Sequence, residues 1–436
     1  ATLPLSDQND PEKTYNPLSL EELRTLYSNI DIEAYLKAAG ADGFHSWVVN
    51  DPGQAKKINS YLTEDHLPLL KEYSIFCLVK DFSPFLTPEI RDSTIAWNNT
   101  QKGVQGKKTD KKLAAELVQN TFGFEFGRLY TEKYFSEEDK KAVETLVHQI
   151  LSAYKERING LEWMGETTKE KAIRKLDHMT LKIGYPDNWP DYYENAVILP
   201  EGRGSLIDNM ITIYRSLRSF EKEEIKKPVD RGQWGMTPQT VNAYYNPLNN
   251  EIVFPAAILQ PPFYDPEAGR AANLGGIGMV IAHEISHAFD SSGSCYDENG
   301  NYNMWWTEED LKKFQELTLR VTEYYNDQEA VKGRYVNGQQ TLNENIADLG
   351  ALACVTSIAG DDTEALDSLF RQYARIWASK YTEESMIHRL NTDVYSPAKV
   401  RVNAVLSSTE AFYKVYPDLK EGDGMYVAPE KWVKIW

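Results

Sequence analysis

The sequence has little cysteine and no long hydrophobic run. Its three cysteines, Cys77, Cys295 and Cys354, are scattered over 436 residues. They are too few and too far apart for a disulfide framework or a zinc site built from cysteines, so we interpret them as free thiols. No run approaches the roughly 18 apolar residues that a membrane helix needs, so we expect no membrane span.

Positive charge is scarce as well. The chain has 47 Lys and Arg residues against 65 Asp and Glu residues, which gives a formal charge of −18. Such an acidic chain repels a phosphate backbone, and no basic stripe offsets the repulsion, so we expect no nucleic-acid binding. Hydrophobic residues make up 42% and charged residues 26%, an ordinary globular mixture with ample material for a core.

Much of the first half has the periodicity of helices. Apolar residues recur at spacings of three and four in several segments. These segments are 19–30, 111–130, 136–158 and 167–179. The aromatic segment 183–193 contains Gly and Pro and interrupts the pattern, so we place a domain boundary near residue 185. After a further helical stretch at 205–226, two β-prone runs in 241–254 flank NPLNN, which predicts a hairpin.

Two of the seven histidines have the spacing of a metal site. The segment GGIGMVIAHEISHAFD (275–290) contains His283, Glu284 and His287. On a helix, residues four apart lie on one face about one turn apart, so both imidazoles can bind one Zn²⁺. Glu284 then lies beside them, where a carboxylate can take a proton from metal-bound water. The alternative is a pair of histidines with hydrogen-bond partners in the core.

A second acidic pair offers a third ligand. The segment TLNENIADLGAL (341–352) contains Glu344 and Asp348, again four residues apart. Glu344 can complete a catalytic site of two histidines and one glutamate with an open fourth position. Asp348 can accept the free ring N–H of one ligand histidine and fix its tautomer. Taken alone, the pair can equally be a helix-capping acid and a surface acid.

With these motifs, the chain resembles the neprilysin and endothelin-converting-enzyme family of zinc peptidases, which includes bacterial oligopeptidase O. The resemblance is dense in the two segments above and at Trp436, and it weakens toward the N-terminus. The other matching segments are 241–264, RIWASKY (375–381) and TDVYSPAKVRVN (392–403). Against the family's usual length, we expect the N-terminal third to be lacking. A processed chain, a truncated chain and a separate N-terminal fragment are all open.

The resemblance implies a mainly α fold with two largely helical domains around an internal cavity. Residues 1–185 would form a cavity-screening domain that is incomplete at its N-terminus. Residues 186–436 would form a thermolysin-like zinc catalytic domain that carries a small β-hairpin or sheet.

The resemblance also implies the roles of the metal-site residues. His283, His287 and Glu344 would hold one zinc ion per chain. Glu284 would be the general base, and Asp348 would support the ligands from outside the coordination sphere.

Further matching positions would bind substrate. Asn242 and Ala243 would line an extended peptide, which agrees with a hairpin edge that can pair with a strand. Arg401 matches an arginine that grips a substrate carbonyl, a task that suits a guanidinium fork. The matching positions of a hydrophobic pocket for the residue after the cut bond are Phe263, Met279, Val280 and Trp377. Without the resemblance, these four would be core residues and Arg401 a solvated surface residue.

One position departs from the family pattern. Six residues before Arg401 the family commonly has a histidine that steadies the tetrahedral oxyanion, and this chain has Tyr395. A phenol O–H can donate the same hydrogen bond, so we predict that the role survives. Unlike an imidazolium, the phenol brings no positive charge.

Together these residues predict a zinc metalloendopeptidase, an oligopeptidase that hydrolyses short peptides. It would prefer a hydrophobic residue after the cut bond and would use a zinc-bound water activated by Glu284. The alternative is a non-catalytic zinc-containing module for peptide binding or interaction. We expect a soluble bacterial protein, either cytoplasmic or exported. The physiological substrate, the oligomeric state and the choice between endopeptidase and dipeptidyl carboxypeptidase stay open.

Overall fold

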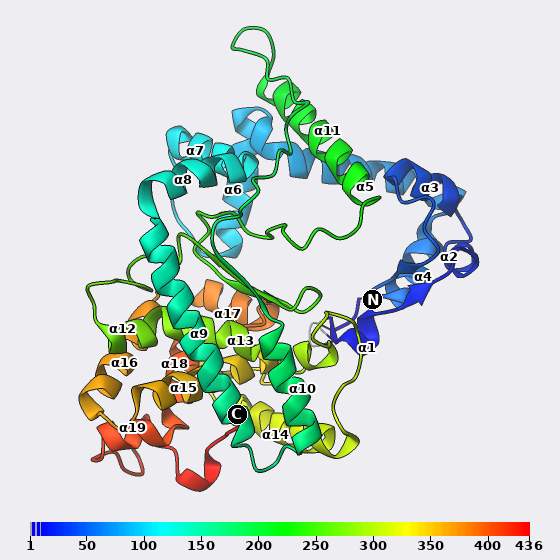
Figure 1. Cartoon of the computed structure of the whole chain (residues 1–436). Coiled ribbons are helices and arrows are strands. Elements are labelled where there is room, and N and C mark those ends of the chain that lie inside the picture. Colours follow the sequence, from blue (N-terminus) through cyan, green and yellow to red (C-terminus); the bar gives the residue numbers. More distant parts are fainter. Residues whose placement is uncertain (1, 5–6, 9) are drawn as a thin grey trace. The chain divides into compact units, whose positions relative to one another are not determined.

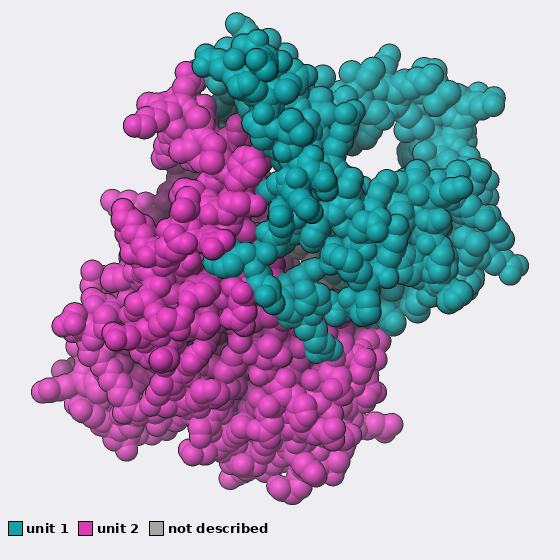
Figure 2. All heavy atoms as spheres, turned by 45° about the horizontal axis from the view of Figure 1, so that its top comes forward, with its two compact units in different colours: residues 1–108, 188–233 teal, residues 109–187, 234–436 magenta. Residues whose placement is uncertain are grey.

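The computed structural model describes residues 2–4, 7–8 and 10–436 (Figure 1). Contacts within the chain divide it into two compact units, each made of two chain segments (Figure 2). The first unit comprises 1–108 and 188–233, and the second comprises 109–187 and 234–436. The chain passes between the units after Asp187, near the boundary expected at residue 185. The division into 1–185 and 186–436 stays a prediction.

The first unit consists mainly of helices. The predicted helix at 19–30 is shorter than expected and begins after Ser19, which forms a capping box with Glu22. The helices of this unit are α1 (Pro11–Thr14), α2 (Leu20–Leu26), α3 (Ile32–Ala39), α4 (Pro52–Tyr61), α5 (Leu67–Phe82), α6 (Pro88–Gln101) and α11 (Leu206–Glu224), with 3₁₀ turns at Glu64–His66 and Ser83–Phe85. Strands β1 (Pro17–Leu18) and β2 (Trp47–Val48) pair antiparallel.

The second unit is also mainly helical. The helix expected at 111–130 is two helices, because the backbone of Phe122 is not helical (φ −108°, ψ 52°). The helices are α7 (Asp110–Thr121), α8 (Gly123–Tyr134), α9 (Glu137–Asn159), α10 (Glu166–Asp177), α12 (Arg270–Asn273), α13 (Met279–Ser286), α14 (Glu308–Asn326), α15 (Leu342–Ala359), α16 (Thr363–Ile376), α17 (Glu383–Thr392), α18 (Ala398–Ser407) and α19 (Glu410–Val415). Shorter helical turns lie at Leu274–Gly278, Gly293–Cys295 and Pro429–Lys431. The mainly α class with small sheets is confirmed.

A three-stranded sheet stands beside these helices, in the order β3 (Thr180–Gly184), β5 (Glu251–Pro255), β4 (Tyr244–Asn246). Strands β3 and β5 are parallel, and β4 and β5 form the predicted antiparallel hairpin. Strand β4 lies at one edge of this sheet, directly after Asn242 and Ala243. A two-stranded ribbon, β6 (Glu329–Val331) with β7 (Arg334–Tyr335), lies elsewhere in the unit.

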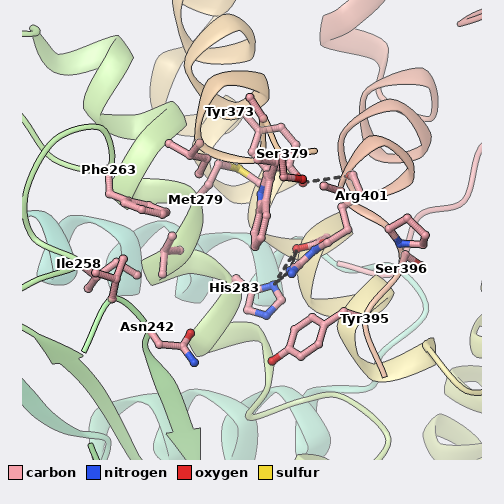
Figure 3. Close-up of a pocket in the computed structure, with 18 of the residues that line it drawn as sticks. Asn242, Ile258, Phe263, Met279, His283, Tyr373, Ser379, Tyr395, Ser396 and Arg401 are labelled. Atoms are coloured by element: carbon pink, nitrogen blue, oxygen red, sulfur yellow. Dashed lines mark hydrogen bonds and ion pairs between the residues drawn. The ribbon is translucent and has the colours of Figure 1, made fainter. Parts of the chain in front are cut away.

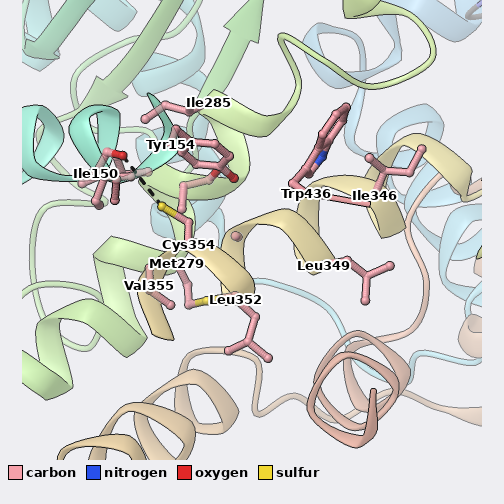
Figure 4. Packing of buried hydrophobic residues seen from close by; sticks show 14 of the residues in the cluster. Ile150, Tyr154, Met279, Ile285, Ile346, Leu349, Leu352, Cys354, Val355 and Trp436 are labelled. Atoms are coloured by element: carbon pink, nitrogen blue, oxygen red, sulfur yellow. Dashed lines mark hydrogen bonds between the residues drawn. The ribbon is translucent and has the colours of Figure 1, made fainter. Parts of the chain in front are cut away.

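Helices α13 and α15 are packed together in the core of the second unit (Figure 4). The apolar side chains of α13 at Ile281 and Ile285 are fully buried. A Cβ on Gly350 of α15 would lie 2.5 Å from the Oγ of Ser286 and 2.6 Å from the indole Cδ1 of Trp436. Glycine therefore lets α15 approach α13 closely. The two helices are held in place by packing before any ligand is considered.

None of the three cysteines forms a disulfide bond, as expected. In the part of the chain that the structure describes, every helix is too short or too polar to cross a bilayer.

Candidate metal centre and substrate cavity

Helices α13 and α15 bring His283, His287 and Glu344 together. His283 lies on α13, and His287, one turn further on, is the residue that caps the end of this helix. Their rings are perpendicular, and their Nε2 atoms are 3.0 Å apart. Near the start of α15, the Oε2 atom of Glu344 lies 3.1 Å from Nε2 of His283 and 3.6 Å from Nε2 of His287. The three donor atoms all lie within 4.8 Å of one another, so one ion can reach all of them.

The chemistry of these donors fits zinc. Oε2 of Glu344 is buried and has no hydrogen-bond partner, an arrangement that is costly unless a cation binds there. Two imidazole nitrogens and one carboxylate oxygen form a donor set of catalytic zinc sites, in which a fourth position stays open. The residues present therefore fit a zinc ion.

A carboxylate holds the second nitrogen of each histidine. Nδ1 of His283 lies 2.8 Å from Oδ1 of Asp348, as the sequence predicts. Nδ1 of His287 lies 2.7 Å from Oδ2 of Asp290, a partner that the sequence analysis missed. The available signal was its position three residues after His287. Both hydrogen bonds direct Nε2 toward the point where the donors meet.

These carboxylates also raise the pKa values of the imidazoles. In the metal-free chain, burial lowers the pKa of His283, but the hydrogen bond with Asp348 and the nearby carboxylate of Glu344 outweigh it and raise the pKa above its ordinary value. Burial also lowers the pKa of His287. The charge of Glu344 and the hydrogen bond with Asp290 outweigh this effect and raise the pKa well above its ordinary value. The imidazoles in turn hold the pKa of Glu344 far below its usual range, against the effect of burial. The carboxylates thus stabilise positive charge at the centre.

Arg401 and Asp348 form a buried ion pair behind His283. Nε and Nη2 of Arg401 each donate to a carboxylate oxygen of Asp348 at 2.7 Å. Both side chains are almost fully buried, so the interpretation of Arg401 as a surface residue is wrong. Its guanidinium also lies 4.0 Å from the ring centroid of Trp377 and 5.0 Å from that of Tyr395. Asp348 therefore joins His283 to a fixed cation.

A cavity of about 400 Å³ lies beside this centre (Figure 3). His283, Glu284 and Arg401 line it. The other expected site residues that line it are Asn242, Phe263, Met279, Val280, Asp348, Trp377 and Tyr395. Ala243 is buried next to Asn242 but does not line the cavity. The sequence analysis missed Ile258 and Ile376, two apolar lining residues inside segments that it had singled out.

Glu284 also lines this cavity, and its carboxylate takes no part in the hydrogen bonds and ion pairs described above. It is only 7% exposed. Burial raises its pKa above the ordinary value, although the neighbouring imidazoles pull it down. A carboxylate with a raised pKa holds a proton more readily, which suits a group that accepts a proton and then returns it.

Tyr395 is anchored to the helix that carries Glu344. The next residue, Ser396, donates its hydroxyl to the Asn345 side chain at 2.7 Å, and Asn345 follows Glu344 on α15. The backbone N–H of Tyr395 donates to Asp393 at 3.2 Å. Tyr395 is 38% exposed, but partial desolvation of its phenol and the nearby carboxylates of Glu344 and Glu284 raise its pKa well above the ordinary value, so the hydroxyl keeps its proton near neutral pH.

The chain belongs to peptidase family M13, a family of zinc metallopeptidases. One model of the family matches residues 242–433, and its N-terminal model matches residues 1–186. This confirms the resemblance to neprilysin and endothelin-converting enzyme.

Several named relatives and solved structures are similar over nearly the whole chain. A neutral endopeptidase of Lactobacillus helveticus is 34% identical over 98% of this chain and 66% of its own length. Neprilysin-3 of Drosophila melanogaster is 30% identical over 100% of this chain and 58% of its own length. The crystal structure of PepO from Lactobacillus rhamnosis has a TM-score of 0.93 at 30% identity and covers 99% of this chain and 68% of PepO. The inhibitor complex of the Mycobacterium tuberculosis zinc metalloprotease Zmp1 has a TM-score of 0.91 at 34% identity, with 99% and 68% covered.

The chain thus spans about two thirds of the length of the bacterial relatives. None of these findings supports a separate N-terminal fragment as a partner.

Asp348→Asn tests the buried ion pair. We expect the metal-free protein to lose about 3–5 kcal/mol of unfolding free energy, because Arg401 stays buried without its counter-charge. Zinc affinity should fall about 10–100-fold, because His283 loses its anionic partner. Urea denaturation and competition with a chelator measure the two effects.

The matched control is Asp361→Asn. The Asp361 side chain is 89% exposed and forms a surface ion pair with Lys414. Its cost should stay below about 1 kcal/mol, with zinc affinity unchanged. Equal losses in the two variants would contradict the role assigned to Asp348.

Proposed function

We propose that this chain is a zinc-dependent endopeptidase that hydrolyses short peptides. The observation that carries the proposal is the convergence of two imidazole nitrogens and one carboxylate oxygen beside a cavity that also contains Glu284. Membership in peptidase family M13 supports it, as does similarity to bacterial neutral endopeptidases.

His283, His287 and Glu344 would hold one zinc ion per chain. When bound, zinc supplies a Lewis acid that polarises a peptide carbonyl and lowers the pKa of a coordinated water to about 7. Asp348 and Asp290 accept hydrogen bonds from the Nδ1–H groups of the two histidines. Each Nε2 lone pair is thereby left for the metal.

Glu284 acts first as a general base and then as a general acid. From its place on α13 it faces the cavity, where it takes a proton from the attacking water. It then delivers this proton to the nitrogen of the leaving amine. The raised pKa caused by burial favours the first step, since a stronger base than an ordinary carboxylate captures the proton of the water more readily.

Tyr395 and Arg401 stabilise the negative charge that develops on the scissile carbonyl oxygen. The Tyr395 hydroxyl keeps its proton and donates it in a hydrogen bond. Arg401 uses Nε and Nη2 to bind Asp348, so Nη1 is available for a substrate carbonyl. The cation of Arg401 supplies positive charge that a neutral phenol does not.

Two surfaces would bind the peptide. Asn242 and Ala243 lead into the edge strand β4, and an extended peptide can pair with such an edge through main-chain hydrogen bonds. The side chain after the cut bond would enter the apolar part of the cavity. The residues expected to contact it are Phe263, Met279, Val280 and Trp377.

Glu284→Gln is the test of the catalytic mechanism. We expect this variant to bind zinc normally and to lose at least about a hundredfold in turnover, because the amide cannot accept the proton. Mass spectrometry of a digested peptide library measures turnover. A chelator should abolish the wild-type activity, and added zinc should restore it.

Glu309→Gln serves as the control, because Glu309 is 78% exposed and forms a surface ion pair with Lys313; it should keep the full rate. Near-normal turnover by Glu284→Gln would refute the assignment. Stoichiometric zinc in the wild type without hydrolysis of any peptide would favour the non-catalytic peptide-binding module.

Tyr395→Phe isolates the hydrogen bond to the oxyanion. We expect kcat to fall about 10²–10³-fold with a much smaller change in KM, because the bond strengthens only as charge develops. Tyr395→His should recover most of the rate, and Tyr335→Phe, on the exposed strand β7, should have no effect. Unchanged kcat in Tyr395→Phe would remove this residue from the mechanism.

The apolar cavity predicts a preference at the residue after the cut bond. In peptides that differ only there, Leu or Phe should give kcat/KM about 10–100-fold above Asp, since burial of such a side chain is worth about 1.5–3 kcal/mol. Phe263→Ala should reduce the difference in kcat/KM between the Leu or Phe peptides and the Asp peptide. Equal rates for the Leu and Asp peptides would contradict the proposed pocket.

A further inference from the structure

Lys175 is a buried cation that takes no part in the mechanism above. It lies on α10 with 1% of its surface exposed. Its Nζ donates to the carbonyl oxygens of Ala288 at 2.9 Å, Gly293 at 2.7 Å and Tyr296 at 2.7 Å. An ammonium group has three N–H donors, so all three are used. All three acceptors belong to the segment that directly follows the helix with the two histidines.

The same segment carries Asp290, the partner of His287. Oδ1 of Asp290 accepts the backbone N–H groups of Ser292 at 2.8 Å and Gly293 at 2.7 Å. Its Oδ2 lies 2.7 Å from Nδ1 of His287. The segment backbone thus fixes one carboxylate oxygen, and the other oxygen orients the imidazole. Any movement of the segment would change the orientation of the His287 imidazole.

The segment is folded tightly between the two helices that supply the ligands. A Cβ on Gly293 would lie 1.8 Å from the backbone oxygen of His287, so the chain returns directly against the end of α13. The side-chain amide of Asn343, next to Glu344 on α15, donates to the Ser292 hydroxyl at 2.9 Å. Lys175 binds this segment from the side of α10 and so completes its attachment.

We propose that Lys175 is a positioning residue for the metal site, holding segment 288–296 so that Asp290 orients the imidazole of His287. The inference rests on the proposed zinc function. Lys175 touches neither the three ligands nor the substrate cavity, so its effect passes through carbonyl groups and Asp290.

Two further observations support this role. The rings of Tyr245 and Trp305 have their centroids 5.8 and 5.9 Å from Nζ, a placement that stabilises a desolvated cation. The charge of Asp290 also favours the protonated amine, because it opposes the burial that lowers the pKa of Lys175 to about 7. Removing the amine would take one donor from each of three carbonyl groups, although the backbone N–H of Tyr296 still donates to Gly293 and the indole of Trp305 still donates to Tyr296, both at 3.1 Å. The loss of these three bonds favours a rearrangement of the segment.

Lys175→Met is the test, with Lys169→Met as its matched control. Lys169 is a second buried lysine of α10, and its Nζ binds the Asn159 carbonyl and Glu166, away from segment 288–296. By chelator competition, we expect Lys175→Met to lose about 10–100-fold in zinc affinity, and Lys169→Met to bind zinc like the wild type. Hydrogen exchange of the metal-free proteins should become faster at residues 288–296 in Lys175→Met alone.

A double-mutant cycle with Asp290→Asn tests the route of the effect. If Lys175 acts through Asp290, the double variant should lose little more zinc affinity than Asp290→Asn alone. Fully additive losses would overturn the proposal, because they would show that the two residues act independently.

The remaining outcomes separate this inference from the proposed function. A wild type that binds no zinc would refute the function itself. Zinc binding that is equal in the wild type and Lys175→Met would overturn only the role of Lys175. Should Lys175→Met fail to fold, Lys175→Gln, which keeps two donors, replaces it. Failure of both while Lys169→Met folds would also overturn the positioning role, in favour of a general requirement for folding.

Discussion

The close packing of α13 against α15 is the constraint on which the site depends. Two imidazoles one turn apart at the C-terminal end of α13 meet two carboxylates one turn apart on α15. Gly350 permits this approach, because a side chain there would collide with Ser286 and with Trp436. The apolar face of each helix is buried in the same core, so hydrophobic burial supplies the energy that brings charged groups into a dry interior.

Several buried charges at the site are paired with a charge or a polar group of opposite sign. Arg401 neutralises Asp348, Asp348 and Asp290 each bind a histidine, and these bonds keep the cost of burial within what a fold can tolerate. Oε2 of Glu344 is buried without a hydrogen bond, 3.1 Å and 3.6 Å from the two imidazole Nε2 atoms. A metal ion at that point would complete the network. The unfolded chain has no preformed site for such an ion. Binding to the folded chain would therefore add to the stability of the second unit.

Much of this arrangement could be predicted from the sequence, because it follows local periodicity. The spacing of His283 and His287 is a helical repeat, and so is that of Glu344 and Asp348. Strand propensity around a turn predicted the hairpin. Asp290 was missed because it lies where the chain leaves the helix and no period applies. Lys175 was missed because a lysine in a charged helix resembles a solvated one, and only contacts more than 100 residues away show its burial. The two-segment units were unpredictable for the same reason: they depend on which distant segments touch.

Anomalous diffraction at the zinc absorption edge tests the central claim most directly. A crystal grown with zinc should show one peak within about 2.0–2.2 Å of Nε2 of His283, Nε2 of His287 and the carboxylate of Glu344, with no fourth protein ligand. Absence of a peak at this point, or a fourth side chain that closes the coordination sphere, would contradict the account.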